Sequence, residues 1–225
     1  MDFIMYGHIH FYKIILLLII FGFITNPAFG DEAECGSIKN HYGPFDYTNP
    51  VHVKNKLPIV EKYHFTKNVA NLISGESSFI YEDLHYTLKT FPNHHRALYS
   101  MMMYQIKNPI SFNKKNVLTI DCYFDLALRF KPTDSVVLML KGIYLEKIGK
   151  SQEALDAYLE ALSFNQNYTE LFYNIGLQYF ELKNYDKALE FAQKAYDNDF
   201  PLPALKDKLT KMGKWKNTET RKQIQ

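Results

Sequence analysis

The sequence lacks most of the patterns that mark an enzyme or a metalloprotein. It has two cysteines but no Cys-x-x-Cys pair, no Gly-x-Ser-x-Gly elbow and no phosphate-binding glycine loop. None of its eight histidines forms a His-x-x-x-His or His-Glu-x-x-His pair. We therefore expect no catalytic residue, no metal site and no cofactor. The adjacent pair His94 and His95 is interpreted as the entry to a helix.

The sequence also lacks an excess of charge of either sign. Its 26 lysines and arginines face 24 acidic residues, which leaves a formal net charge of +2. A balance this close to neutral gives no general reason to expect nucleic acid as a partner. Only the tail after Lys206 is locally basic, and such a run is usually a solvated helix end.

No apolar run reaches the roughly 20 residues that a membrane-spanning helix needs. The longest one, IILLLIIFGF, follows Lys13 and leads into NPAFG, with Ala28-Phe29-Gly30 as the expected cleavage box. This order is typical of a secretory signal. We expect residues 1–30 to be a signal peptide, and the mature chain to be periplasmic or secreted with no membrane span. The alternative is an uncleaved N-terminal membrane anchor.

The two cysteines, Cys35 and Cys122, both lie in the exported part of the chain. A pair in an oxidising compartment is most simply a disulfide. Two free buried thiols are the alternative.

A repeat with a fixed period organises the second half of the chain. The segment from Leu171 to Asp199 has the pattern of two amphipathic helices broken at Lys183-Asn184. Small residues recur in phase at the same spacing: Gly142 with Gly176, Ala154 with Ala188, and Ala161 with Ala195. Glycine and alanine are needed where two helices cross closely, so the period predicts stacked helix pairs.

These residues resemble the tetratricopeptide repeat, whose units are about 34 residues long. One unit matches at Phe172, Ile175, Gly176, Tyr179, Tyr185, Ala188 and Ala195, and the preceding unit at Leu138, Gly142, Leu145, Ala154, Tyr158 and Ala161. Lys141 departs from the pattern where the family has leucine. The resemblance implies an all-α solenoid of antiparallel helix pairs that binds proteins and has no enzymatic activity.

The expected organisation follows from this register. After the signal peptide, residues 31–77 form an irregular N-terminal segment packing on the repeats, in which Thr66 is expected to cap a short helix. The repeat region covers 78–202 and a capping helix with a basic tail covers 203–225. Within the repeat region we expect a helix at 78–91, a repeat at 92–134 with an insertion at 109–116, and repeats at 135–168 and 169–202.

The whole chain is also similar to exported bacterial tetratricopeptide proteins. The residues that carry this likeness are Cys35-Gly36, Tyr42 to Tyr47, Val60 to Phe65, Phe91 to Leu98, and Gly213-Lys214-Trp215. This resemblance implies an exported helical-repeat protein and names no reaction.

In tetratricopeptide proteins the first helix of each pair lines a concave groove. Carried over by register, the groove-facing residues form apolar pairs four positions apart, which share one helix face. The expected partner-binding residues are Arg96, Tyr99, Met103, Met139, Ile143, Tyr173 and Leu177. An apolar groove of this kind suits a peptide or a helix of a partner protein.

Three functions therefore remain in view. The first is a scaffold in the cell envelope whose groove binds a protein or peptide partner. The second is a structural accessory subunit of an envelope complex, whose N-terminal segment fills the groove through Tyr42, Phe45 and Tyr47. The third and least favoured is a metal-dependent enzyme that uses the N-terminal histidines.

Overall fold

Every regular element that the structure describes is a helix. The computed structural model describes residues 35–76, 79–109 and 117–215, so the expected signal peptide and most of the expected insertion 109–116 lie outside the described residues. The helices are α2 (Pro50–Asn55), α3 (Leu57–His64), α4 (Lys67–Ala70), α5 (Ile80–Thr90), α6 (His95–Lys107), α7 (Ile120–Phe130), α8 (Ser135–Lys147), α9 (Ser151–Phe164), α10 (Thr169–Glu181), α11 (Tyr185–Tyr196) and α12 (Ala204–Lys211).

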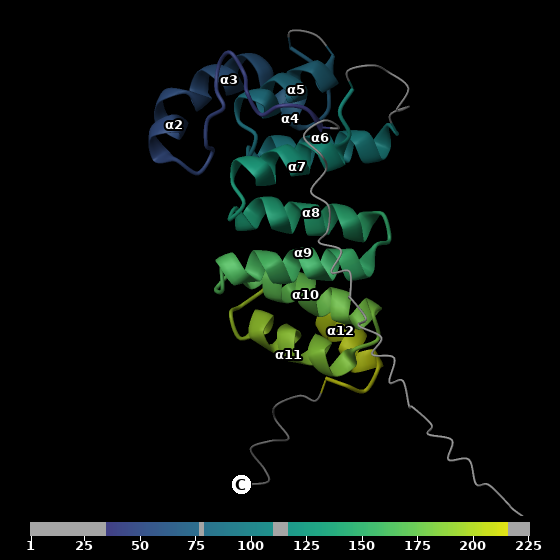
Figure 1. Ribbon diagram of the computed structural model, residues 1–225. Coiled ribbons are helices and arrows are strands. Elements are labelled where there is room, and N and C mark those ends of the chain that lie inside the picture. Colours follow the sequence, from purple (N-terminus) through teal and green to yellow (C-terminus); the bar gives the residue numbers. More distant parts are fainter. Residues whose placement is uncertain (1–34, 77–78, 110–116, 216–225) are drawn as a thin grey trace, which may run out of the picture.

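From α6 to α11 the helices follow one another down a single stack, and α2 to α5 lie together at its N-terminal end (Figure 1). Helix α8 pairs with α9, α10 pairs with α11, and α9 packs against α10, which joins the two pairs. Helix α12 closes the stack against α10 and α11. The predicted all-α solenoid of helix pairs is confirmed.

The small residues of the repeat lie where helices cross. A Cβ atom placed on Gly142 of α8 would be 2.5 Å from the ring of Tyr158 on α9. A Cβ on Gly176 of α10 would be 2.6 Å from Leu205 of α12 and 3.4 Å from the α11 backbone. A larger side chain would displace the Tyr158 ring at Gly142, and at Gly176 it would displace Leu205 and crowd the α11 backbone.

The pair α6 and α7 is more open than the pair α8 and α9. Met102 stands on α6 where Gly142 stands on α8, and it is fully buried in the main hydrophobic cluster. Its flexible side chain fills the space between α6 and α7. In the next pair, α8 and α9 lie closer together, so no such space is left.

The turns inside the two regular pairs have the same backbone geometry but different residues. Gly149 after α8 has φ +80°, and Lys183, one repeat period later, has φ +61° after α10. In both turns the positive-φ residue and the residue after it donate their backbone N–H groups to carbonyls in the last turn of the helix, as in a Schellman cap. Lysine carries in this conformation a steric cost that glycine avoids.

We predict that Lys183→Gly stabilises the protein by about 0.5–1 kcal/mol, because relief of the left-handed strain outweighs the added freedom of the unfolded chain. Urea unfolding monitored by circular dichroism measures the change. Lys187→Gly, inside α11, is the control and should destabilise by about 1 kcal/mol. A loss of stability for both variants would contradict the account.

The N-terminal segment contains three short helices, two of which the sequence analysis did not predict. Thr66 Oγ1 accepts a hydrogen bond from the N–H of Val69 and caps α4, as predicted. Asn49 caps α2, because its side chain accepts hydrogen bonds from the N–H groups of Val51 and His52. Pro50 is the first residue of the helix. Helix α3 packs on α5, and α4 contacts α5 and α6. These helices therefore extend the stack at its N-terminal end.

Residues 35–49, here called the strap, are fastened to α5 and α7. Cys35 forms the predicted disulfide with Cys122 of α7. Arg129 of α7 donates a hydrogen bond to the carbonyl of Gly36, and Lys89 of α5 donates to the carbonyl of Ser37. The disulfide thus joins two segments that are 87 residues apart in sequence.

We predict that reduction of the disulfide lowers the melting temperature by on the order of 10 °C, because opening a loop of this length releases about 4 kcal/mol of unfolded-state entropy. Calorimetry with and without reductant measures the shift. The double variant Cys35→Ser/Cys122→Ser should melt at the lower temperature under both conditions. Equal melting temperatures of the parent with and without reductant would rule out a stabilising crosslink.

A buried asparagine joins the strap to the starts of α6 and α8. The Asn93 amide donates to Asp46 at 2.8 Å and to Asp134 at 2.9 Å, and its oxygen accepts from the N–H of Tyr47. Asp134 in turn caps α8 by accepting from the N–H groups of Val136 and Val137. Lys131 pairs with Asp46 at 2.8 Å, and these contacts hold the pKa of Asp46 below its usual range against the opposing effect of burial.

His94 caps α6 with its imidazole ring. Nδ1 accepts from the N–H of Ala97 at 3.2 Å, and Nε2 lies 3.2 Å from the Glu61 carboxylate, to which it donates. The cap needs a lone pair on Nδ1, so it requires the neutral ring. Burial lowers the pKa of His94, and the nearby Glu61 opposes that shift only in part. Burial also lowers the pKa of His85, whose ring bonds to Tyr123.

We predict that stability falls as the pH drops from about 7 to 5.5. The folded-state pKa values of His94 and His85 lie below the unfolded value of 6.5, so the unfolded chain binds more protons in this range. The carboxylates with lowered pKa, Asp46 and Glu61, lose their contribution only at more acid pH.

Unfolding free energies measured at several pH values test this expectation. His94→Asn keeps a capping side chain but cannot titrate, so its stability should depend less on pH than that of the parent. His41→Asn, at an exposed histidine, is the control for the loss of one histidine from the chain. If the unfolding free energy of the His94 variant depends on pH as steeply as that of the parent, His94 is not a source of the pH dependence.

Candidate functional site

A hollow of about 360 Å³ opens between the N-terminal helices, α6 and α8. We call it the groove hollow. Its lining residues are Phe65, Ala70, Asn71, His95, Arg96, Tyr99, Ser100, Val136 and Leu140. Its volume falls within the range of small-ligand and side-chain pockets. The hollow lies on the first helices of two successive pairs, the position expected for the groove.

The walls of the groove hollow are apolar and its rim is polar. The Arg96 guanidinium lies 5.2 Å from the centre of the Phe65 ring and 3.6 Å from the Glu61 carboxylate, and its side chain is 62% exposed. Ser100 donates its hydroxyl proton to the carbonyl of Ala70, which ties α6 to the end of α4. The side chain of Asn71 is exposed. The site thus offers an apolar surface, one cation and one amide.

On α6, two of the three predicted groove residues line the hollow. Arg96 and Tyr99 do so, and Tyr99 is 46% exposed. Met103, one turn beyond Tyr99, is half-buried and packs against the main hydrophobic cluster. Arg96 and Tyr99 therefore form the accessible part of the predicted stripe on this helix.

On α8, the residues that line the hollow differ from the predicted pair. Met139 and Leu140 are equally buried in the main cluster, and Val136 and Ile143 pack against it, but only Val136 and Leu140 of these four line the hollow. Adjacent helix positions are about 100° apart, so the accessible face is turned by one position relative to the predicted register. The rotated face of α8 lies next to the pair α6 and α7, whose wider spacing is filled by Met102.

The predicted residues on α10 lie in a separate cluster at the C-terminal end of the stack. The ring of Tyr173 stacks on Phe200 at a centroid distance of 4.3 Å, and the side chain is almost fully buried. Leu177 packs against the same cluster, which includes residues of α11 and α12. The structure does not bring these two residues together with Arg96 and Tyr99.

Three lining residues, Phe65, Ala70 and Asn71, were missed because residues 31–77 were treated as lying outside the repeat. One signal was available in the sequence. Phe65 precedes Tyr99 by one full repeat period, the spacing that separates Gly142 from Gly176, so it could have been assigned to an additional N-terminal unit.

The strap takes a route that leaves Tyr99 exposed. Phe45 packs on Phe91, and its N–H donates to the carbonyl of Thr90 at the end of α5. Tyr47 stacks on His94 at 4.2 Å in the cap of α6. Tyr42 contacts Phe45 and lies beside α3, and Tyr47 also contacts His95, which lines the groove hollow.

Five histidines of the N-terminal half hydrogen-bond to protein groups through their rings: His52, His64, His85, His94 and His95. His95 bonds to Asp134 at 3.0 Å and His64 to Asp83 at 3.0 Å, while His52 accepts from the N–H of Asp46. Among the residues that the structure describes, no cluster of three or more potential ligands has the arrangement to hold a metal ion. In residues 35–76, 79–109 and 117–215, no helix has the length and apolar character that crossing a bilayer requires.

Comparison with known sequences finds the repeat family directly. The family model described as the tetratricopeptide repeat matches residues 169–200. The chain is 35% identical over 72 residues to the peroxisomal targeting signal receptor of Candida albicans, covering 32% of this chain and 12% of that protein. It is 28% identical over 105 residues to the human protein O-mannosyl-transferase TMTC3, covering 47% and 11% respectively. The chain thus spans about a tenth of the length of these curated relatives.

Solved structures of MamA are similar to the chain at low sequence identity. "Crystal structure of MamA" is 16% identical and covers 74% of this chain and 84% of that one, with a TM-score of 0.44. "MamA MSR-1 C2" is 18% identical and covers 64% and 74%, with a TM-score of 0.42.

The family match ends close to the end of α11 and covers the pair α10 and α11. The preceding pair, α8 and α9, has its crossing glycine, its alanines and its positive-φ turn one repeat period earlier. Together with the stacked helix pairs, these observations show that the chain contains tetratricopeptide repeats over α8 to α11.

Proposed function

We propose that this protein is a non-enzymatic scaffold whose groove hollow binds a peptide segment of a partner protein. Tetratricopeptide repeats indicate protein–protein interaction, and the observation that carries the more specific proposal is the accessible apolar wall of the hollow. Tyr99 is 46% exposed there, beside Phe65, Val136 and Leu140. An exposed aromatic surface with few polar groups is the usual form of a peptide-binding groove.

The polar rim defines how such a segment would be held. An apolar side chain of the partner would lie against Tyr99 and Leu140, where burial of each apolar group contributes about 1.5–3 kcal/mol. The Arg96 guanidinium would pair with a carboxylate, and the Asn71 amide would bond to the partner's backbone. A segment that combines an apolar anchor with an acidic group therefore fits the site best.

The alternative, an accessory subunit whose own N-terminal segment fills the groove, is less well supported. The strap is fastened to α5 and α7 through the disulfide and through Phe45, and its Tyr47 contacts one lining residue of the hollow, His95. The exposure of Tyr99 supports an open groove over a self-filled one.

We also propose that the protein acts outside the cytoplasm, in the periplasm or as a secreted protein. The basic, apolar and small-residue order of residues 1–30 supports export. The Cys35–Cys122 disulfide adds support, because such bonds persist in oxidising compartments.

Photo-crosslinking in intact cells tests both parts of the proposal. Benzoylphenylalanine placed at Tyr99 should give a discrete adduct with a partner protein in the periplasmic or secreted fraction, whereas the same probe at Tyr185 on α11 should not. Arg96→Glu should weaken the adduct at Tyr99 several-fold, because it reverses the charge at the rim.

Two outcomes would contradict the proposal. Equal adducts at Tyr99 and Tyr185, or none at Tyr99, would exclude the groove hollow as the binding site. An adduct found only in the cytoplasmic fraction would exclude export while leaving the groove assignment intact.

A further inference from the structure

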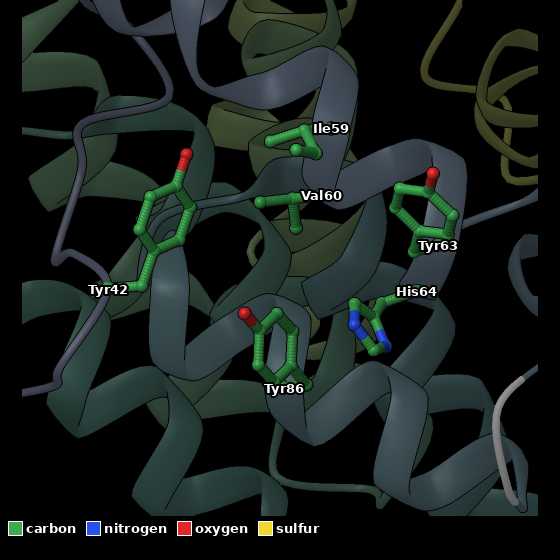
Figure 2. Close-up of a pocket in the computed structure, with 6 residues that line it drawn as sticks. All are labelled: Tyr42, Ile59, Val60, Tyr63, His64 and Tyr86. Carbon is green, nitrogen blue, oxygen red and sulfur yellow. The ribbon is translucent and has the colours of Figure 1, made fainter.

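A second hollow of about 300 Å³ lies on the other side of α3, outside the groove. Figure 2 shows Tyr42, Tyr63 and Tyr86 standing around Val60, with Ile59 beside it. With His64, these residues line the hollow, which we call the tyrosine bowl. His64 lines the bowl while its neighbour Phe65 lines the groove hollow, so α3 separates the two sites.

The bowl has an apolar floor and an exposed aromatic rim. Val60 is 2% exposed and belongs to the small cluster that also contains Leu57 and Phe91. Ile59 and Tyr63, four positions apart on one face of α3, are each 53% exposed. Large apolar side chains gathered at this level of exposure around a recess are typical of a binding surface.

The rim carries positive charge and hydrogen-bond donors. The ammonium group of Lys56 lies 5.8 Å from the Tyr42 ring, and that of Lys62 lies 4.9 Å from the Tyr63 ring, so one lysine borders each of these two tyrosines. Neither lysine has an ion-pair partner among the described residues. No carboxylate is among the lining residues. The lining residue His64 bonds to the buried Asp83, and a ligand that supplies negative charge and acceptors would complement the two lysines.

We propose that the tyrosine bowl is a second docking site that binds an acidic segment of a partner protein, with one apolar side chain inserted over Val60. The recess favours a polypeptide over a bilayer, because a flat surface would touch the rim and leave the floor uncovered. Charge disfavours end-to-end association of two copies, since exposed Lys206 and Lys211 on α12 make the opposite end basic as well. The proposal does not depend on the groove hollow.

Fluorescence anisotropy with a defined probe tests it at about 0.15 M salt, where long-range attraction is screened beyond roughly 8 Å. The probe is a labelled peptide, Glu-Asp-Glu-Leu-Glu-Asp-Glu, and we expect it to bind saturably. The same peptide with serine in place of leucine, and the peptide Lys-Arg-Lys-Leu-Lys-Arg-Lys, should each bind at least about tenfold more weakly.

Matched variants locate the binding. Lys56→Glu/Lys62→Glu should weaken the affinity at least about tenfold. Lys54→Glu/Lys67→Glu changes the net charge equally, at lysines that do not border the bowl, and should have a much smaller effect. Ile59→Ser should also weaken binding. Because the groove hollow would accept an acidic segment as well, each titration is repeated in the Arg96→Glu background, where the losses caused by the bowl variants should persist. Melting curves confirm that each variant is folded.

Several results would overturn the proposal that the tyrosine bowl binds an acidic segment. Absence of saturable binding by the acidic peptide, or equal losses in the two charge-reversed variants, would overturn the proposal. Binding to vesicles of phosphatidylglycerol and phosphatidylcholine without binding to the peptide would also overturn it, and would assign the surface to an anionic bilayer. Loss of all saturable binding in the Arg96→Glu background would assign the peptide to the groove hollow.

Discussion

The close crossing of paired helices is the constraint on which the rest of the structure depends. At Gly142 the ring of Tyr158 occupies the space in which any side chain would stand, and at Gly176 the side chain of Leu205 does the same. Close contact at these points sets the spacing of α8 to α11 and seats α12 on the last pair. Where Met102 replaces glycine, the pair α6 and α7 opens, and the groove hollow lies beside this more open unit.

The N-terminal segment completes the stack and creates both candidate binding sites. Asn93 and Asp134 bind the strap to the starts of α6 and α8, while the disulfide fastens its first residue to α7. Helices α3 and α4 are thereby held against α5 and α6. One side of this unit supplies Phe65 to the groove hollow, and the other supplies Tyr63 to the tyrosine bowl. Loss of the strap would therefore disturb both sites.

The sequence could predict the roles of residues that recur with the repeat period and of residues that begin a helix. The period linking Gly142 to Gly176 predicted the paired helices, and the presence of two cysteines after the expected signal peptide predicted the disulfide. His94 was recognised as a helix-entry residue, but its neutral ring as the actual cap of α6 depends on Glu61, a contact 33 residues away. No local pattern encodes such a contact.

The groove residues were harder to predict because an accessible face depends on how neighbouring helices are turned. Tyr99 and Arg96 lie where the register placed them in the hollow, whereas α8 presents Val136 and Leu140 in place of Met139 and Ile143. Tyr173 is covered by Phe200 at the end of the last repeat, where the preceding unit has Gln166. Which residues bind the partner remains a prediction.

Hydrogen–deuterium exchange of the protein with its crosslinked partner, purified and compared with the free protein, tests the central claim most directly. If the groove hollow holds the partner segment, protection should increase in α4, in the first half of α6 and around Val136 to Leu140 of α8. Helices α10 to α12 should exchange as in the free protein. Protection confined to α10 to α12, or to the convex helices α9 and α11, would contradict the account.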